Sequence, residues 1–581
     1  MQFIDTRQLR RYSVCVCCVW LASFQRANAE ADLILHHGKI VTVDSKFSVQ
    51  EAIAVTGNRI TAVGDSASVL QNKGSATKLL DLEGRMVLPG LIDSHVHPEA
   101  ALTEFDHPLP SMESIRDVLE YVTARAQVVP AGEWISLRQV FITRLREQRY
   151  PTRAELDEAA PNHPVSFATG PDQVLNTLAL KRAGIDRHFK VTDGGPGHIE
   201  LDPTTGEPSG LLRGLGRFVK ITTSGKQPSE EDRYRRTVEL FKDYNSVGLT
   251  TVCDRNADSI AIQRYQTMLD RGDLPVRLAI SHGVSTLGTL EEIQSRIRNV
   301  AEHPLRHGGP MLRIIGIKTF LDGGMLTGSA YMREPWGVSK IYGITDPNYR
   351  GVLNIPVERL LPIVKATVDA GLQFTAHSVG DGAVHTLLDV YEEIDRTTPV
   401  RKTRACITHS NFMSRDAVER AARLGVLVDI QPVWLYLDTR TLVNQFGYDR
   451  LRYFQPLKSI FAQGGIAGGG SDHMQKIGSL RAINPYNPFL GMWIAITRQA
   501  RWYEGKLHAE EALTREQAIR FYTRNNAYLL FLEDLVGSLE PDKLADLIVL
   551  DRDLLQCRED EIRDAQVLQT YLNGKLVFDK R

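Results

Sequence analysis

Residues 86–97 read MVLPGLIDSHVH, an apolar run that ends in two histidines separated by one residue. A short apolar run of this kind predicts a buried strand, here residues 86–95. Side chains two positions apart on a strand point to the same face, so His95 and His97 would project together. The stretch therefore predicts a strand whose carboxyl end presents a pair of imidazoles.

Seven further apolar runs along the chain predict strands, and amphipathic stretches that favour helices lie between most of them. The runs are residues 250–254, 276–282, 312–319, 372–377, 404–409, 426–431 and 466–471. Eight parallel strands with intervening helices make an α/β fold, the (β/α)8 TIM barrel. Residues 98–246 are too long for one strand-to-helix connection, which predicts a large insertion after strand one.

Short β patterns occupy both ends of the chain. Residues 31–44, 51–64 and 567–578 each predict a hairpin around a glycine-containing turn, and residues 546–551 predict one more strand. One composite β-sandwich built from both termini accounts for all of them. The predicted domains are a sandwich of residues 30–86 and 537–581 and a barrel of residues 87–536, which contains the insertion.

The overall composition excludes several classes of protein. The 581 residues carry 69 Lys and Arg against 70 Asp and Glu, and this balance argues against a nucleic-acid-binding surface. No apolar run after the N-terminus reaches the roughly 20 residues that a membrane span requires. The expected partner is a small-molecule substrate, and a homo-oligomer remains open.

The first 29 residues have the layout of a secretory signal peptide. Arg7, Arg10 and Arg11 precede an uncharged stretch at residues 13–24, and the small-residue sequence Ala-Asn-Ala ends at residue 29. We expect cleavage there and a periplasmic or secreted protein; the general secretory and twin-arginine routes both remain open. The alternative reading is a frayed N-terminal helix.

Four other predicted strands also end in residues that bind metals or move protons. In such a barrel the functional residues lie at the carboxyl ends of the strands. These ends carry Lys318, His377, His409 and Asp472, in addition to His95 and His97. A lone H-x-H is often a surface pair and a lone lysine often reaches solvent, but five such ends in one barrel favour convergence. Imidazole and carboxylate ligands suit a divalent cation, zinc first, with manganese or iron as alternatives.

These motifs identify a resemblance to a known family. LPGLIDSHVH at residues 88–97 resembles the first-strand signature of metal-dependent amidohydrolases. The chain is more closely similar to amidohydrolase family 3, which includes N-substituted formamide deformylases. The supporting motifs are GEWI (132–135), NTLAL (176–180), TGEPSGLL (205–212), GLTTVCD (248–254), IKTFLDGG (317–324), TAHSVGDGAV (375–384), GGSD (469–472) and GSLEPDKLADLIVLD (537–551).

The resemblance implies roles for the six strand-end residues. It makes His95, His97, Lys318, His377, His409 and Asp472 the ligands of one or two metal ions. The lysine of strand four is carboxylated in some relatives and then bridges two metals. Asp472 would bind metal, accept a proton from water and deliver one to the leaving amine.

The resemblance leaves the substrate open, because the chain departs from the family pattern near the site. Thr408 stands where relatives commonly have glutamate, and His473 follows Asp472 where a small residue is frequent. Asp322, Trp434 and Arg481 are candidate substrate-binding residues, with a turn as the alternative role of Asp322.

Three functional hypotheses follow from these residues. The leading one is an exported, metal-dependent hydrolase of a non-peptide C–N bond: an amide, formamide or N-acyl group. The alternatives are a deaminase or cyclic-amide hydrolase on the same metal centre, and a catalytically inactive binding or regulatory protein.

Overall fold

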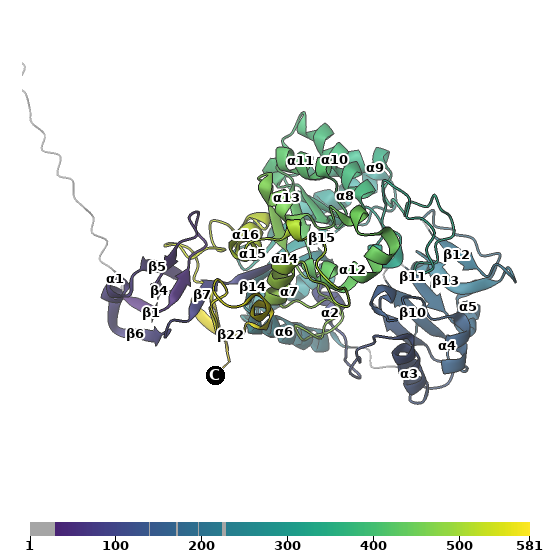
Figure 1. The fold of residues 1–581 in the computed structure, drawn as a ribbon, viewed down its shortest axis with the longest axis horizontal. Helices are drawn as coiled ribbons and strands as arrows, with labels where there is room; N and C mark the ends of the chain where they lie inside the picture. Colours follow the sequence, from purple (N-terminus) through teal and green to yellow (C-terminus); the bar gives the residue numbers. More distant parts are fainter. Residues whose placement is uncertain (1–29, 139, 170–171, 196, 223–227, 581) are drawn as a thin grey trace, which may run out of the picture.

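The computed structural model describes most of the chain after the predicted leader, whose residues 1–29 lie outside the described part. The described residues are 30–138, 140–169, 172–195, 197–222 and 228–580. Figure 1 shows an elongated molecule with a β-rich region at one end, a central barrel and a second α/β region at the other end.

A parallel sheet of eight strands forms the centre of the molecule, and its strands lie side by side in chain order. They are β8 Leu91–Val96, β14 Leu249–Ala257, β15 Arg277–Gly283, β16 Leu312–Phe320, β17 Gln373–Ser378, β18 Cys406–His409, β19 Leu427–Ile430 and β20 Ala467–Gly469. Asp472 N donates to His95 O at 2.8 Å, and His97 N donates to His473 O at 3.0 Å. These bonds join the last strand end to the first, which confirms the predicted barrel.

Helices follow the barrel strands and cover the outside of the sheet (Figure 1). The main ones are α7 Ser259–Arg271, α8 Leu290–Ala301, α9 Val357–Asp369, α10 Asp381–Asp395, α11 Arg415–Leu424, α12 Pro432–Phe446, α13 Leu457–Ala462, α14 Pro488–Thr497, α15 Arg515–Phe521 and α16 Arg524–Leu529. In α8, Thr289 and Glu292 form a capping box, and the helix buries Ile293, Ile297 and Val300. This spacing places one apolar stripe against the sheet.

Two further sheets at one end of the molecule combine strands from both ends of the chain. The four-stranded sheet contains β1 Ala31–His36, β4 Ala52–Thr56, β5 Arg59–Gly64 and β6 Lys73–Asp81. The six-stranded sheet contains β2 Lys39–Val41, β3 Val49–Gln50, β7 Met86–Pro89, β21 Leu547–Leu550, β22 Val567–Leu572 and β23 Lys575–Asp579. Leu35, Ile53, Val87 and Leu547 are buried in one cluster between them.

The hairpins predicted at residues 51–64 and 567–578 are present as β4–β5 and β22–β23. The hairpin predicted at residues 31–44 is wrong, because β1 and β2 belong to different sheets. His37, between them, has φ +53°, a left-handed conformation that redirects the chain. A glycine-containing turn between two β runs therefore does not establish that the runs pair.

The single strand predicted over residues 86–95 is also wrong, since it is two strands in different sheets. β7 ends before Gly90 and β8 begins after it, so the chain passes from the sandwich into the barrel at this glycine. A Cβ atom at Gly90 would lie 2.2 Å from Thr250 Oγ1. Glycine therefore allows the close approach to β14 at the crossing point.

The segment between β8 and β14 forms a separate five-stranded sheet at the far end of the molecule (Figure 1). Its strands are β9 Ile135–Arg138, β10 Val165–Thr169, β11 Asp172–Leu175, β12 His198–Leu201 and β13 Pro208–Arg213, with α3 Ile115–Ala126, α4 Arg153–Ala159 and α5 Thr177–Ala183 beside them. Arg213 donates to the backbone oxygen of Thr327 at 3.0 Å, in the segment after β16. α6 Glu230–Ser246 then leads back to the barrel.

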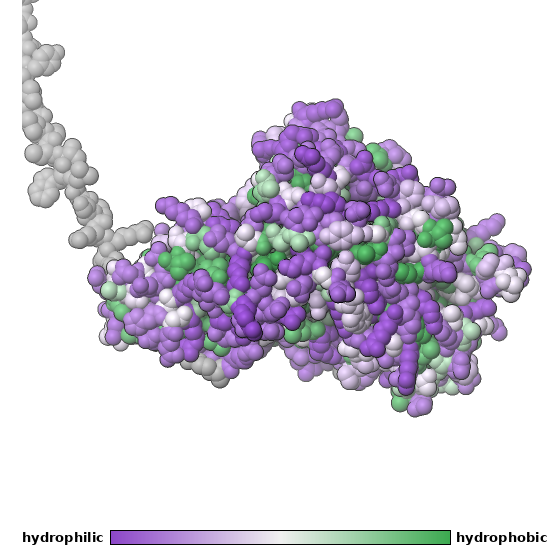
Figure 2. Space-filling view, in the orientation of Figure 1, coloured by the Kyte–Doolittle hydropathy of each residue, from purple (hydrophilic) through white to green (hydrophobic). Residues whose placement is uncertain are grey.

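The outer surface is predominantly hydrophilic on the face shown in Figure 2, with small scattered hydrophobic areas. Among the described residues, no helix combines the length and apolar character needed to cross a membrane.

Candidate active site

Three of the predicted ligands form a tight group where the first and last barrel strands meet. His95 Nε2 lies 3.1 Å from His97 Nε2, and Asp472 Oδ1 lies 3.5 Å from the first nitrogen and 3.2 Å from the second. Two ligands bound at about 2.0–2.1 Å to a tetrahedral zinc ion lie roughly 3.3 Å apart. The three donor atoms therefore fit one divalent cation.

The histidines of strands five and six lie directly beside this group. The ring centroids of His377 and His409 are 4.6 Å apart, and those of His95 and His409 are 5.0 Å apart. His377 Nε2 lies 3.2 Å from the backbone oxygen of Gly323, which leaves its Nδ1 available. The two rings therefore extend the cluster of imidazoles at the barrel mouth.

Lys318 extends from β16 into the same cavity as these ligands. The side chain is fully buried, and within the described part of the chain its Nζ has no hydrogen-bond partner. A buried ammonium without a hydrogen-bond partner is costly, whereas a carbamate on this nitrogen would bring two anionic oxygens to the metal ligands. The orphaned amine therefore fits a carboxylated lysine.

Two residues at the end of strand seven, which were not among the predicted site residues, hold the histidines in place. Asp429 Oδ2 accepts from His95 Nδ1 at 2.9 Å, and Gln431 Oε1 accepts from His409 Nδ1 at 2.7 Å. Both contacts direct Nε2 of the ring toward the ligand cluster, as outer partners of metal-binding histidines do. Asp429 lies in β19 and Gln431 directly after its end, two residues apart, a spacing that could have identified them.

Arg255 compensates the charge of this buried network. Its Nε lies 3.6 Å from Asp429 Oδ2 and donates to the backbone oxygen of Ser94 at 2.9 Å. Ser94 Oγ donates to Asp429 Oδ1 at 2.6 Å. Because the aspartate is fully buried, its charge depends on these partners.

Burial sets the protonation states that metal binding requires. Burial, reinforced by the positive charge of Lys318, holds the pKa of His95 well below its usual value and lowers that of His377 to about 3. Burial also lowers the pKa of Lys318 to about 8 and raises the pKa of the Asp472 carboxyl. His95 and His377 are therefore neutral, as ligands must be, and Lys318 loses its proton around pH 8.

Two of the cluster residues have left-handed backbone conformations that non-glycine residues rarely adopt. His409 has φ +74° and Asp472 has φ +54°. Asp472 is held there by its backbone bond to His95 and by Asn484 Nδ2, which donates to its carbonyl oxygen at 2.6 Å. Such strain persists where the surroundings impose it, and it is concentrated at functional sites.

A cavity of about 550 Å³ opens onto the cluster, and most of its wall is apolar. The barrel contributes Phe320, Leu326, Trp434 and Met474, and the insertion contributes Arg213 and neighbouring residues. The cavity thus lies between the barrel mouth and the inserted sheet. Its size and lining are typical of a site for a small organic ligand.

The three predicted substrate-binding residues lie in different environments in the structure. Trp434 lines the cavity. Asp322 also lines it, but its carboxylate accepts backbone N–H groups of Tyr331, Val379 and Gly380 at 2.9–3.0 Å and so anchors loops. Arg481 is not brought to the cluster: it pairs with Glu104 at 2.6 Å in the wall of a different cavity.

Two known proteins are similar to nearly the whole chain. An N-substituted formamide deformylase of Arthrobacter pascens is 29% identical over 94% of this chain and 98% of its own length. The putative amidohydrolase YtcJ of Bacillus subtilis is 23% identical over 94% of this chain and 99% of its own length.

The fold also matches a solved structure. An uncharacterized metal-dependent hydrolase of Pyrococcus horikoshii superimposes with a TM-score of 0.65 at 22% identity, covering 91% of this chain and 99% of its own. The model of the amidohydrolase family matches residues 78–578, from the sandwich through the whole barrel. The chain belongs to the amidohydrolase family of hydrolases.

Proposed function

We propose that this protein is an exported metal-dependent hydrolase that cleaves a non-peptide C–N bond in an amide, formamide or N-acyl compound. The observation that carries the proposal is the buried cluster of four histidines, Lys318 and Asp472 at the mouth of an apolar cavity. The 29% identity to a formamide deformylase along nearly the whole chain supports the type of bond.

The ligand residues fall into two sets, one for each proposed metal ion. His95, His97 and Asp472 would hold one ion, and His377 and His409 a second, with carboxylated Lys318 between them. When bound, the metal supplies Lewis acidity that polarises the carbonyl group and lowers the pKa of water. The neutral imidazoles, held by Asp429 and Gln431, keep their lone pairs directed toward that position.

Asp472 carries the proton in the proposed reaction. Its carboxylate accepts a proton as water adds to the carbonyl carbon, and it returns that proton to the nitrogen as the C–N bond breaks. The products are a carboxylic acid and an amine, which together contain all the atoms of the substrate and the water. Burial raises the pKa of Asp472, which favours its role as the temporary proton carrier.

The cavity indicates the kind of substituent that accompanies this bond. Phe320, Leu326, Trp434 and Met474 form an apolar wall beside the cluster. The charged groups that the insertion contributes are already paired, since Arg213 contacts Asp172 at 2.9 Å. An uncharged substrate with an apolar nitrogen substituent would therefore fill the cavity without leaving buried charge unpaired.

A substrate panel separates the three hypotheses. Purified protein loaded with zinc would be assayed with N-substituted formamides, N-acyl amines, cyclic amides and amino-substituted heterocycles. Release of a substituted amine supports the proposal, whereas ammonia or a ring-opened product supports one of the enzyme alternatives. A protein that holds stoichiometric metal and turns over no member of the panel would favour a binding or regulatory role.

A further inference from the structure

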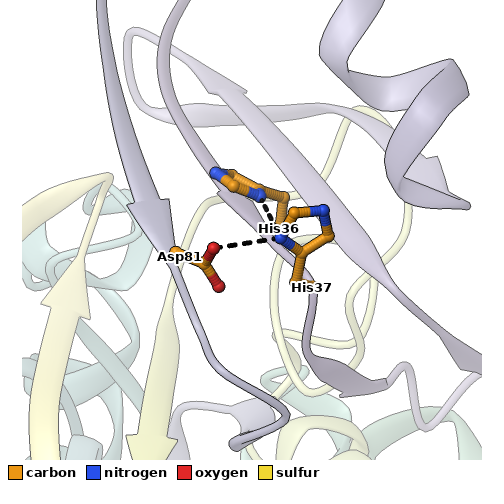
Figure 3. A group of neighbouring side chains, drawn as sticks. All are labelled: His36, His37 and Asp81. Carbon is orange, nitrogen blue, oxygen red and sulfur yellow. Dashed lines mark hydrogen bonds and ion pairs between the residues drawn. The ribbon is translucent and has the colours of Figure 1, made fainter.

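A second group of metal-binding side chains lies in the sandwich, outside the barrel. His36 is the last residue of β1, His37 follows it, and Asp81 is the last residue of β6. β1 and β6 pair in parallel, and the register sets His36 beside Asp81. Figure 3 shows the three side chains turned toward one another at this edge of the sheet.

The contacts within this group compete for one nitrogen atom. His37 Nδ1 lies 3.1 Å from His36 Nδ1 and 3.0 Å from Asp81 Oδ2. A ring nitrogen has one position in its plane, which holds either a proton or a lone pair. A proton on His37 Nδ1 can at most be shared between the carboxylate and the other ring, so hydrogen bonding gives neither contact its full strength.

A metal ion resolves this competition, because all three atoms then act as lone-pair donors. Their separations of 3.0 and 3.1 Å approach the roughly 3.3 Å expected between ligands of a tetrahedral ion with bonds of about 2.0–2.1 Å. Two imidazoles and one carboxylate suit zinc, nickel or copper(II) better than calcium or magnesium.

The backbone around the group already holds the ligands in position. His37 has φ +53°, and its N–H donates to Ser66 Oγ at 3.0 Å, which turns its ring back toward His36. Asp81 Oδ1 accepts the N–H of Glu83 at 2.9 Å and leaves Oδ2 directed inward. The strained residue is thus the one that brings the second imidazole into reach.

Two of the three ligand side chains are exposed to solvent, and the third is buried. The side chains of His37 and Asp81 are 57% and 52% exposed, whereas His36 is 8% exposed. An ion can therefore enter directly from solvent, and water can complete its coordination. The Asp81 carboxylate contributes a negative charge that attracts a cation.

We propose that His36, His37 and Asp81 bind one divalent transition-metal ion, of the zinc, nickel and copper(II) class, that links the end of β1 to the end of β6. The ligands are His36 Nδ1, His37 Nδ1 and Asp81 Oδ2. The site is separate from the barrel cluster, and its ion stabilises the sandwich rather than taking part in the reaction.

The test is a titration of tag-free protein with zinc in a calorimeter. The catalytic metal is already bound before the titration begins. His37→Gln and Asp81→Asn remove one ligand each, and His188→Gln is a matched control because His188 is an exposed histidine of the insertion. Wild type and His188→Gln should bind one more zinc per chain than His37→Gln. Asp81→Asn should lose at least about tenfold in affinity, since even outer partners of a metal ligand contribute that much.

Two further readouts keep the proposal testable if a variant is unstable. Zinc should raise the melting temperature of wild type more than that of His37→Gln, because an ion bound only to the native state stabilises it. In wild-type crystals soaked in zinc, an anomalous peak should lie within bonding distance of both Nδ1 atoms. Equal stoichiometry and affinity in wild type and His37→Gln, or no peak between these atoms, would overturn the proposal and leave only the hydrogen bond between His37 and Asp81.

Discussion

Replacing Lys318 by alanine tests whether the metal centre contains a carboxylated lysine. Lys318 is fully buried without a hydrogen-bond partner among the described residues. An ammonium cannot bind a cation, whereas a carbamate offers two oxygens that can bridge two ions. We therefore expect Lys318→Ala to hold one metal per chain instead of two and to lose most of its activity. The measurements are metal analysis by mass spectrometry and turnover of the best substrate.

The pKa of Lys318 gives the expected pH dependence of carboxylation. Only the neutral amine attacks carbon dioxide. With a pKa of about 8, roughly a quarter of the amine is neutral at about pH 7.5, compared with about one part in a thousand at the usual lysine pKa of 10.5. If bicarbonate is adjusted at each pH to hold dissolved carbon dioxide constant, reactivation of metal-stripped protein by zinc should therefore accelerate as pH rises toward about 8 and level off above it. A rate that keeps rising tenfold per pH unit up to pH 10 would contradict the lowered pKa.

Chemical rescue provides the sharper control. Acetate or propionate can place a carboxylate in the space left by the side chain, so either acid should restore part of the activity of Lys318→Ala. Lys318→Arg fills that space with a permanent cation and should not be rescued. If Lys318→Ala instead keeps its full metal content and only binds acidic substrates more weakly, the carbamate idea fails. Lys318 is then a residue that binds substrate directly.

Four further results are expected. Asp472→Asn should retain the fold and part of the metal but lose about 10²–10⁴-fold in kcat, because the amide cannot accept the proton; activity within about twofold of wild type would remove Asp472 from the mechanism. Asp429→Asn should lower metal affinity by about 10–100-fold through its bond to His95, measured by competition with a chelator. Arg481→Gln should leave kcat/KM near wild type, since that guanidinium pairs with Glu104 away from the cavity. N-terminal sequencing should find the mature chain beginning near Glu30 outside the cytoplasm, and an intact Met1 on cytoplasmic protein would contradict export.

Local patterns were sufficient to predict the barrel and the cluster at its mouth. Each barrel strand is a short apolar run, and a strand buried on both faces needs little beyond that composition. His95 and His97 occur two residues apart at a strand end, and the parallel arrangement brings the ends of distant strands to the same face. The convergence of Lys318, His377, His409 and Asp472 could therefore be predicted without knowing any distance.

Which strands pair, and which side chains hold the ligands, were decided only by the tertiary structure. The β1 and β2 runs look like a hairpin, yet sheet pairing is a long-range choice, and the left-handed turn at His37 sends them into different sheets. Gly90 divides one apolar run between two sheets because of a close approach to Thr250, which lies far away in sequence.

The same limit applies to individual side chains at the site. Asp429 and Arg481 are both charged residues near strand ends, but one contacts His95 while the other pairs with Glu104. A sequence lists the groups able to form such contacts. Which contact forms depends on the positions of residues hundreds of places apart, and those positions are set by packing of the whole chain.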